Sequence, residues 1–342
     1  MDNKCPCIHY GQSGLQLRIS RFRVRLLAGA LFLFSPTKAG NYIVMKKSFI
    51  SRLMKPNLLR RIRNKVRSFF ILDQWIVLIA KNIEYKSLSW SSFKKLVPPA
   101  DRVWADPFIW IYENKYYIFV EELFYKTGRG HIICLTLDED LNIISNQVVL
   151  EKPYHLSYPF LFEHNGQLYM LPETKQNNRV ELYRCTRFPD QWKFEKTLID
   201  NIRVVDSTLL ETNGKWWLFA NIQEGDRSSL DTLCLYYADN LLSNRWTPHP
   251  LNPIVRNIHS ARPAGRIFSS KGSLIRPSQD CSARYGYAIN FNRIVTLTET
   301  DYVETNKHAF KPPDKGKILA THTFNSMGKL TAIDAIQRRR KI

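Results

Sequence analysis

The sequence predicts an all-β protein, a five-bladed β-propeller with a short basic N-terminal helix or arm. Three ungapped segments, which begin at Ala105, Ser157 and Val205, share an apolar strand, a short turn and an aromatic-rich strand. They recur at offsets of 52 and 48 residues. A unit of about 50 residues with about four strands is typical of a propeller blade. Aromatic residues make up 13% of the chain, which also favours strands over helices.

Each segment carries a turn signal between its two strands. Asn165-Gly166 and Asn213-Gly214 are strong signals for two-residue hairpins, and Glu113-Asn114 takes the same place in the first segment. Further strand-like stretches follow each hairpin, among them HIICLTLD and VELYRCTRF. We therefore expect about four strands in each unit.

The remaining units are less regular. A fourth begins at Ala261 with Lys271-Gly272 in its turn, and we expect a weaker fifth from about Gln279 to Glu299. Residues 69–80 and 318–336 are also strand-like, and we expect one of these two stretches to complete the last blade. The propeller should then span residues 68–337.

The net charge of +20 is concentrated at the two ends of the chain. Residues 1–67 hold 15 Lys/Arg and one acidic residue, Asp2, which gives +14, and a basic tail at 338–342 adds +4. The body is therefore nearly neutral. Basic ends of this kind are more often solvated arms than base-reading surfaces, and no nucleic-acid-binding motif appears. We expect no nucleic-acid partner.

The basic leader, residues 1–67, is expected to be partly disordered, with one amphipathic helix at about 56–70. Apolar residues there recur at three- and four-residue steps among basic ones: Leu58, Leu59, Ile62, Val66 and Phe69. Such a helix either packs on the domain or attaches the chain to anionic lipid or an acidic partner. We expect a cytoplasmic protein that makes peripheral contact with the inner membrane surface through this helix.

Membrane-spanning helices and disulfides are not expected. No apolar run approaches the roughly 20 residues that cross a bilayer. The apolar run at 26–34 resembles a signal-peptide core, but it sits late and lacks a good cleavage site. Cysteines at 134, 185, 234 and 281 lie in or beside strand-like runs about 50 residues apart, which predicts buried thiols in a reducing compartment. A zinc site would need several close pairs, and only Cys5 and Cys7 lie close together, so we expect neither a metal nor a cofactor.

The residues best suited to chemistry lie where the first strand of each blade opens onto one face of a propeller. The aligned second position of the four units holds Asp106, Tyr158, Asp206 and Arg262. The blade-end position adds Glu121 and Glu173. Further binding candidates are Trp104, Glu122, His155, Arg276 and Asp280.

Converging carboxylates beside an arginine favour a small polar ligand, and nearby aromatic rings such as those of Trp104 and Tyr158 suit the faces of a sugar. Glycoside chemistry needs two carboxylates, one a protonated acid and the other a base or nucleophile. Mutual repulsion in a cluster can raise one pKa enough to make the acid. The structural alternative is that an Asp at a strand entry only caps a turn.

Ala105-Asp106-Pro107, followed by a hairpin and Tyr-Ile-Phe, resembles the first blade of five-bladed propeller glycosidases of the arabinanase and β-xylosidase group. The resemblance implies that Asp106 is a general base or nucleophile. Those families carry an Asp on blade two and a Glu acid on blade three, each before Pro. Here Tyr158-Pro159 and Asp206-Ser207 stand at these places, so Glu173 or Asp206 would have to supply the acid.

Residues from about 69 to 336 are more similar to a narrower family, through the motifs DQWIVLIA, PPADRVWADPF, HLSYPF, LPET, VDSTLL, ARPAG and RPSQDC. This is the propeller domain N-terminal to the transferase in plant glucosamine inositolphosphorylceramide transferases, also found in bacterial proteins of sugar-modification and formyltransferase gene neighbourhoods. The resemblance implies a role in glycan or glycolipid assembly and a glycosyltransferase or formyltransferase partner.

Three hypotheses remain open at this point. The first is a carbohydrate-binding or carbohydrate-processing propeller that holds a sugar in its central channel. The second is an active glycosidase or transglycosidase that uses Asp106 with Glu173 or Asp206. The third is a non-catalytic scaffold that docks a partner enzyme.

The N-terminus gives a first testable prediction. Met45 begins a plausible translation start, MKKSFISRLMKP, and we expect residues 1–44 to be an upstream extension of the natural protein. Mass spectrometry of the native protein should find a first peptide that starts at Met45. Peptides from residues 1–44 would contradict this expectation.

Overall fold

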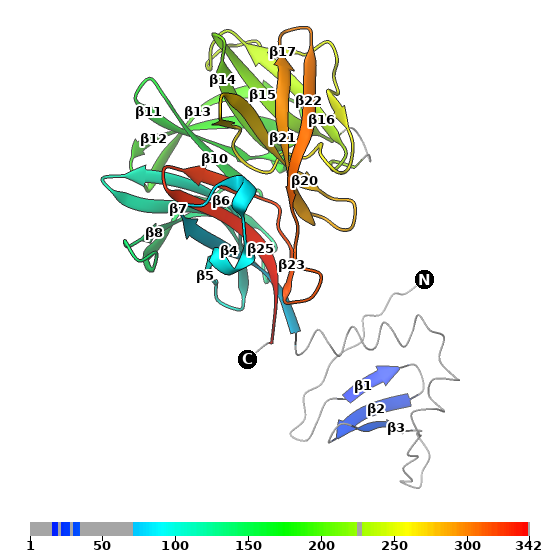
Figure 1. Ribbon diagram of the computed structural model, residues 1–342. Coiled ribbons are helices and arrows are strands. Elements are labelled where there is room, and N and C mark those ends of the chain that lie inside the picture. The colour runs from blue at the N-terminus through cyan, green and yellow to red at the C-terminus, as the bar shows by residue number, and fades with distance from the viewer. Residues whose placement is uncertain (1–15, 20–21, 28–29, 35–70, 224–227, 341–342) are drawn as a thin grey trace. The chain divides into compact units, whose positions relative to one another are not determined.

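The computed structural model describes residues 16–19, 22–27, 30–34, 71–223 and 228–340 (Figure 1). The chain divides into two units, residues 1–70 and 71–342. In the first unit β1 (Gln16–Ile19), β2 (Phe22–Leu27) and β3 (Ala30–Phe34) form an antiparallel sheet in that order. The helix expected at about 56–70 lies outside the described residues.

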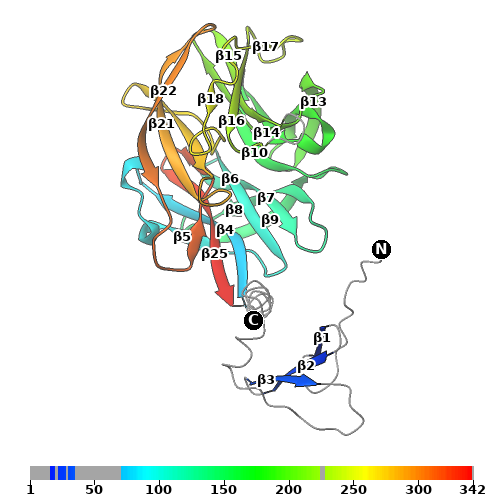
Figure 2. The ribbon, with the colours of Figure 1, turned by 90° about the vertical axis from the view of Figure 1, so that its right-hand side faces the viewer.

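The second unit consists of five antiparallel sheets, which confirms the predicted five-bladed β-propeller (Figure 2). Blade one contains β6 (Arg102–Tyr112), β7 (Lys115–Phe124), β8 (Gly130–Leu137) and β9 (Ile143–Leu150). Blade two contains β10 (Ser157–His164), β11 (Gln167–Glu173), β12 (Arg179–Arg187) and β13 (Gln191–Asp200), with the short helix η3 (Lys175–Asn177) between β11 and β12.

Blades three and four follow the same order along the chain. Blade three contains β14 (Val204–Thr212), β15 (Lys215–Ile222), β16 (Thr232–Ala238), β17 (Thr247–Pro248) and β18 (Val255–Arg256). Blade four contains β19 (Phe268–Ser270), β20 (Ser273–Asp280), β21 (Ala288–Leu297) and β22 (Tyr302–Phe310). The expected fifth unit at 279–299 is therefore wrong, because its strands are β20 and β21 of blade four.

Both ends of the second unit complete blade five, whereas the sequence analysis expected only one to do so. The blade joins β4 (Ile71–Lys81) and β5 (Lys94–Leu96) to the C-terminal strands β23 (Ile318–Ala320), β24 (Phe324–Met327) and β25 (Leu330–Arg340). β4 and β25 run side by side over their full length (Figure 1). Arg338, Arg339 and Arg340, which the sequence assigned to a basic tail, lie in β25, and Arg338 forms a 2.9 Å ion pair with Asp73 of β4.

Backbone geometry explains why the hairpins form where the sequence predicts them. Two-residue turns that match the twist of antiparallel strands need two consecutive residues with positive φ. All four predicted pairs adopt this conformation: Glu113-Asn114, Asn165-Gly166, Asn213-Gly214 and Lys271-Gly272. Gly or Asn, which tolerate positive φ best, stands in the second place of every pair.

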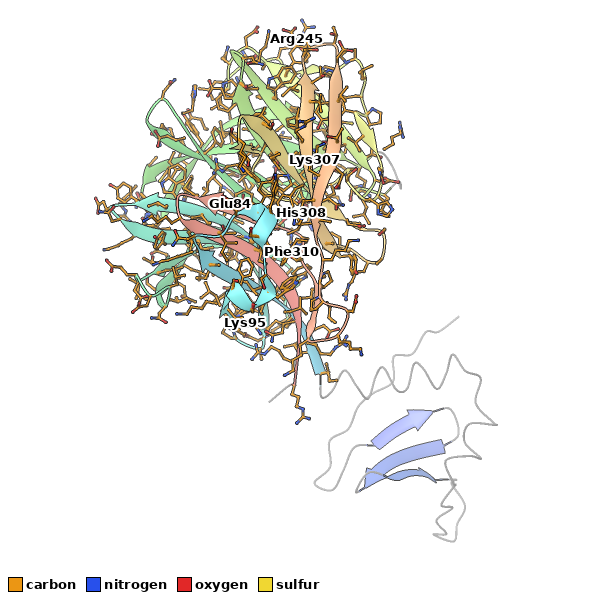
Figure 3. The ribbon with its side chains drawn as sticks, viewed as in Figure 1. Glu84, Lys95, Arg245, Lys307, His308 and Phe310 are labelled. Carbon is orange, nitrogen blue, oxygen red and sulfur yellow. The ribbon has the colours of Figure 1, made fainter. Side chains whose placement is uncertain are left out.

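Apolar contacts between neighbouring blades form the core. One cluster joins blades one to three, and others join blade three to four, four to five and five to one. The connection from β4 to β5, with η1 (Tyr85–Ser87) and η2 (Trp90–Ser92), adds aromatic contacts with β22 (Figure 3). The Trp90 ring stacks on Phe310 at 4.5 Å, and Tyr85 meets His308 edge-on at 6.4 Å. The four cysteines of the propeller are buried, as the sequence predicted.

The axis of the propeller is closed by side chains at the level of Tyr158. The Tyr158 hydroxyl, from blade two, accepts the backbone N–H of Gly265 in blade four at 2.7 Å, and it lies 2.8 Å from the Thr208 hydroxyl of blade three. Blades two and four are not neighbours in the ring, so this contact crosses the axis. Arg266 of blade four also crosses it and donates to the Leu161 carbonyl. The polar residues discussed below therefore lie above a filled axis.

No helix within the described part of the chain is long and apolar enough to cross a membrane.

Substitution of Gly265 tests how closely blades four and five approach each other at the axis. A Cβ at Gly265, where φ is +123°, would lie 2.0 Å from the Phe324 carbonyl oxygen, whereas a Cβ at Gly214, where φ is +71°, meets nothing within 4 Å. Gly265→Ala should lower the free energy of unfolding by more than about 3 kcal/mol. Gly214→Ala should cost only about 1–2 kcal/mol, because it pays for the backbone conformation alone. Urea denaturation checks both, and equal losses would contradict the close approach.

Candidate functional site

Three blades carry the same backbone irregularity at the aligned second position. The first strand of each shifts register there, between Ala105 and Phe108, between Ser157 and Phe160, and between Val205 and Thr208. The residues inside these β-bulges, Asp106, Tyr158 and Asp206, have φ of 52°, 46° and 52°. A bulge re-aims a side chain, and among residues other than Gly the left-handed conformation is tolerated best by Asn and Asp. Two of the three positions accordingly hold Asp, and the fold maintains a costly backbone conformation at Tyr158.

Blade five contributes His322 at the equivalent position. Phe324 pairs with Ile333 as Phe108 pairs with Phe119, and His322 precedes Phe324 by two residues as Asp106 precedes Phe108. The equivalent positions of the five blades therefore hold Asp106, Tyr158 and Asp206 within β6, β10 and β14, and Arg262 and His322 ahead of β19 and β24. We call the charged residues that meet here the axial cluster: Asp106, Glu121, Glu173, Asp206, Arg262, His322 and Asp334.

Asp106 is buried where blade one meets blades two and five. Its Oδ1 accepts the Thr323 hydroxyl at 2.7 Å, and its Oδ2 accepts the backbone N–H of Tyr158 at 3.2 Å. The Asp106 N–H donates to Asp334 Oδ2 at 3.0 Å. Burial raises the pKa of Asp106 to about 6, although the nearby His322 acts in the opposite direction. At neutral pH the Asp106 carboxyl is therefore mostly ionised.

Asp206 and Arg262 form a buried ion pair between blades three and four. Arg262 Nε donates to Asp206 Oδ2 at 2.6 Å, and the Gln279 amide donates to the same oxygen at 3.0 Å. Burial alone would lower the pKa of Arg262, but the Asp206 carboxylate outweighs it and the pKa lies above its ordinary value. The guanidinium also lies 5.0 Å from the centre of the Tyr285 ring, which is 43% exposed. Tyr285 is thus an aromatic residue beside this cluster that is partly exposed to solvent.

Glu121 lies in β7 of blade one, three residues before its end, and Glu173 ends β11 of blade two. The Glu121 carboxyl lies 3.3 Å from His155 Nε2, while His155 Nδ1 accepts the Gly130 N–H at 2.9 Å. The proton of the neutral ring is therefore on Nε2 and faces Glu121. Burial and the charge of Asp106 raise the pKa of Glu121 well above its ordinary range. Burial and the charge of Asp206 raise the pKa of Glu173 to about 8.

Four sequence candidates lie away from the axial cluster. The Trp104 indole is buried and donates to Glu122 at 2.8 Å, and Glu122 also contacts Arg102 and His131. Adjacent strand residues point to opposite faces, so Glu121 meets the cluster while Glu122 turns away from it.

The same alternation separates Gln279 from Arg276 and Asp280. Gln279 reaches Asp206, whereas Arg276 forms an ion pair with Glu304 at 2.6 Å beside a separate pocket of about 410 Å³ at blades three and four. Asp280 accepts the Ser282 N–H at 2.9 Å and contacts His259. The Tyr158 ring is fully buried and packs on Phe108, so it does not present a face to a ligand.

Four residues at the axial cluster were not predicted from the repeats: His322, Asp334, Gln279 and Tyr285. His322 and Asp334 were missed because the fifth unit was placed at 279–299 rather than at the end of the chain. A usable signal was present: His-Thr-Phe followed by a hairpin at Met327–Leu330 resembles Asp-Pro-Phe and its hairpin in blade one, although each strand of the hairpin is one residue shorter.

Within the described residues, one group brings three potential metal ligands together. Donor atoms of Asp106, His322 and Asp334 lie within 4.8 Å of one another. His322 Nδ1 is 2.6 Å from Asp334 Oδ2, and Asp106 Oδ1 already accepts the Thr323 hydroxyl. These contacts are those of a hydrogen-bonded network, and the expected absence of a metal stays a prediction.

Comparison with protein families identifies the lineage of the propeller. The family profile described as glucosamine inositolphosphorylceramide transferase 1, N-terminal, matches residues 87–326, more than half of the chain. The chain belongs to this family. The recognition of the narrower family from sequence motifs is confirmed.

Two plant proteins named glucosamine inositolphosphorylceramide transferase 1 illustrate the relationship. The protein of Oryza sativa subsp. japonica is 37% identical over 205 residues, and that of Arabidopsis thaliana is 34% identical over 204 residues. Each alignment covers 58% of this chain but only 27% and 26% of the relatives. The aligned part thus amounts to about a quarter of the length of either relative.

Solved propeller structures show the same fold at low sequence identity. A family 117 glycoside hydrolase of Zobellia galactanivorans has a TM-score of 0.50 and 12% identity, covering 78% of this chain and 91% of its own. The catalytic domain of a GH62 α-L-arabinofuranosidase of Coprinopsis cinerea has a TM-score of 0.50 and 12% identity, covering 77% and 97%. A GH43 β-xylosidase/α-arabinofuranosidase from a compost metagenome has a TM-score of 0.50 and 13% identity, covering 69% and 90%. These likenesses concern the fold alone.

The raised pKa of Glu173 predicts a specific pH dependence of stability. Between its unfolded pKa of about 4.5 and its folded pKa of about 8, the unfolded chain gives up a proton that the folded chain keeps. The contribution of Glu173 to stability is therefore full below about 4.5 and is lost as the pH rises toward 8. Glu173→Gln should gain stability relative to the parent protein from pH 5 to pH 9, as measured by urea denaturation.

The exposed Glu163 of the same blade provides the matched control. Glu163→Gln should keep a constant offset from the parent protein over this pH range. A constant offset for Glu173→Gln as well would contradict the raised pKa.

Proposed function

We propose that the axial cluster binds a glycosyl unit and that the propeller serves glycan or glycolipid assembly. The observation that carries this proposal is the meeting of acidic groups, an arginine and an exposed tyrosine ring where the first strands of the blades approach the axis. Carboxylates and an arginine supply fixed acceptors and donors for hydroxyl groups, and Tyr285 supplies a face for a sugar ring. Family membership supports a role in glycan or glycolipid assembly, because the plant relatives are named glucosamine inositolphosphorylceramide transferase 1.

The same proposal assigns a partner and a location. The chain would work beside a glycosyltransferase or formyltransferase, since the relatives join this propeller to further sequence that the alignments do not cover. We place it in the cytoplasm at the inner membrane surface, attached through the basic segment at 56–70, as its amphipathic pattern indicates.

A second candidate function, glycoside cleavage or transfer, is supported by the separation of two pKa values. Glu173, with a pKa of about 8, is mostly protonated at neutral pH and suits a general acid. Asp106, with a pKa of about 6, is mostly ionised and suits a base or nucleophile. Carboxyl groups whose surroundings drive their pKa values apart are the usual arrangement in glycosidases. Asp206 is less suited to the acid role, because Arg262 and Gln279 both donate to it.

Ligand-induced thermal stabilisation of the full chain tests the proposal. The panel is glucosamine, N-acetylglucosamine, other monosaccharides, uronic acids, nucleotide sugars and aryl glycosides. A sugar at about 100 times its Kd should add roughly 2.7 kcal/mol to stability. Asp106→Asn should abolish that gain while changing the unliganded protein by no more than about 1–2 kcal/mol, because Asn tolerates the left-handed conformation.

Two tyrosines of equal exposure provide the control. Tyr285→Ala should weaken binding. Tyr112 ends β6, six residues beyond Asp106, and Tyr112→Ala should leave binding unchanged. Release of the aryl group, lost in Glu173→Gln, would establish cleavage; binding without release would leave the carbohydrate-binding function alone. If no sugar stabilises the protein, the proposal fails and the scaffold hypothesis takes its place.

A further inference from the structure

His322 is held in a fixed orientation by Asp334. The His322 Nδ1 atom lies 2.6 Å from Asp334 Oδ2, and Asp334 Oδ1 accepts the backbone N–H groups of His322 and Thr323 at 2.9 and 3.0 Å. A carboxylate acceptor at Nδ1 requires a proton there, which leaves Nε2 as the outward-facing atom of the ring. Asp334 is fully buried, so solvent does not compete for the hydrogen bonds that hold the ring in this orientation.

The flat faces and edge of the imidazole are also fixed. Trp75 of β4 stacks on the ring with centroids 4.1 Å apart and planes inclined by 19°. The Tyr285 ring meets it edge-on at 5.4 Å and 88°. These contacts leave the His322 side chain only 4% exposed. The ring therefore has no freedom to turn Nε2 toward another partner.

The Nε2 atom of His322 has no hydrogen-bond partner among the described residues. Its facing acceptor, Asp106 Oδ1, lies 3.8 Å away, which is beyond hydrogen-bond reach. A single hydroxyl oxygen about 2.8 Å from both atoms would bridge this gap, accepting from Nε2–H and donating to the carboxylate. A histidine that served only to hold blades together would not need an oriented Nε2 that has no hydrogen-bond partner.

We propose that His322, oriented by Asp334, forms with Asp106 a clamp that recognises one hydroxyl group of the bound sugar. This inference rests on the proposed function and names the contact by which the axial cluster selects its ligand. Nε2–H is the donor and the Asp106 carboxylate is the acceptor; Asp106 lies in β6 of blade one, and His322 lies just before β24 of the neighbouring blade five. Charge-assisted hydrogen bonds of this kind are among the stronger ones in proteins.

The clamp predicts a bell-shaped dependence of sugar affinity on pH. Asp106, with a pKa of about 6, loses its charge as the pH falls below that value. Burial favours the neutral imidazole and by itself would lower the pKa of His322. The charges of Asp334 and Asp106 outweigh this effect and raise the pKa, so the imidazolium loses a proton only above the ordinary pKa of histidine. The other groups that face the pair are Asp206, Glu121 and the Tyr285 hydroxyl. Affinity should therefore be highest between the two pKa values and fall on both sides.

Two substitutions at His322 separate recognition from structure. An Asn side chain keeps an amide near Asp334 but removes the group that faces Asp106, so His322→Asn should weaken binding by about tenfold or more. A Gln side chain reaches the Nε2 position without titrating, so His322→Gln should retain part of the affinity and lose the alkaline limb of the pH profile. The exposed His259 gives the control, and His259→Asn should leave affinity unchanged.

The test measures binding of methyl N-acetylglucosaminide and methyl glucoside to the full chain by calorimetry from pH 5 to pH 9. Monodeoxy analogues of whichever probe binds are then measured with the unmodified protein, which avoids dependence on the folding of any variant. One deoxy position should lose about tenfold or more in affinity and also lose the pH dependence, because a built donor and acceptor are left unpaired.

The outcomes distinguish the clamp from the proposed function. If a probe binds and Asp106→Asn abolishes binding, but the pH profile is flat and His322→Asn binds normally, the clamp is overturned and the proposed function stands. Equal affinity for all monodeoxy analogues would also overturn the clamp. If neither probe nor any sugar of the wider panel binds, both are overturned.

Discussion

The pairing of β4 with β25 is the constraint on which the rest of the propeller depends. It joins residues at opposite ends of the described propeller in one blade and so closes the ring. The same pairing places Asp334, which lies opposite Val77, and brings Trp75 of β4 onto His322. Without this blade Asp106 would lose both its backbone partner Asp334 and its side-chain partner Thr323. Ring closure is therefore needed to complete the axial cluster around Asp106.

Burial of charge at the axis is made tolerable by pairing across neighbouring blades. Asp206 is matched by Arg262 from the next blade, and Asp334 is matched by His322 and by backbone N–H groups. An unpaired buried charge would be strongly destabilising. The acids that have no cationic side chain bonded to them, Glu121, Glu173 and Asp106, respond with raised pKa values. The protonation states of the acids in the site thus depend on which of them are paired with a cationic group and which are not.

Side chains that fill the axis close the propeller beneath the axial cluster. Tyr158 and Arg266 cross from one side of the ring to the other, and Gly265 lets the chain pass close to Phe324. Tyr158 shares the aligned position with Asp106 and Asp206, yet its phenol is used for this contact. One repeated position therefore serves two purposes: it supplies charged side chains of the axial cluster in some blades and closes the axis in another.

The sequence by itself determined the fold class, because its repeats carry local signals: two-residue turns that need positive φ and aromatic strands at a constant offset. It also located Asp106, Asp206, Arg262 and Glu173, since a repeat aligns equivalent positions without any knowledge of distance. Only the tertiary structure decided which of two adjacent residues faces the axis, as with Glu121 and Glu122, because strand alternation depends on register. It alone brought His322 and Asp334 to Asp106, more than 200 residues away along the chain, since this contact exists only when the ring is closed.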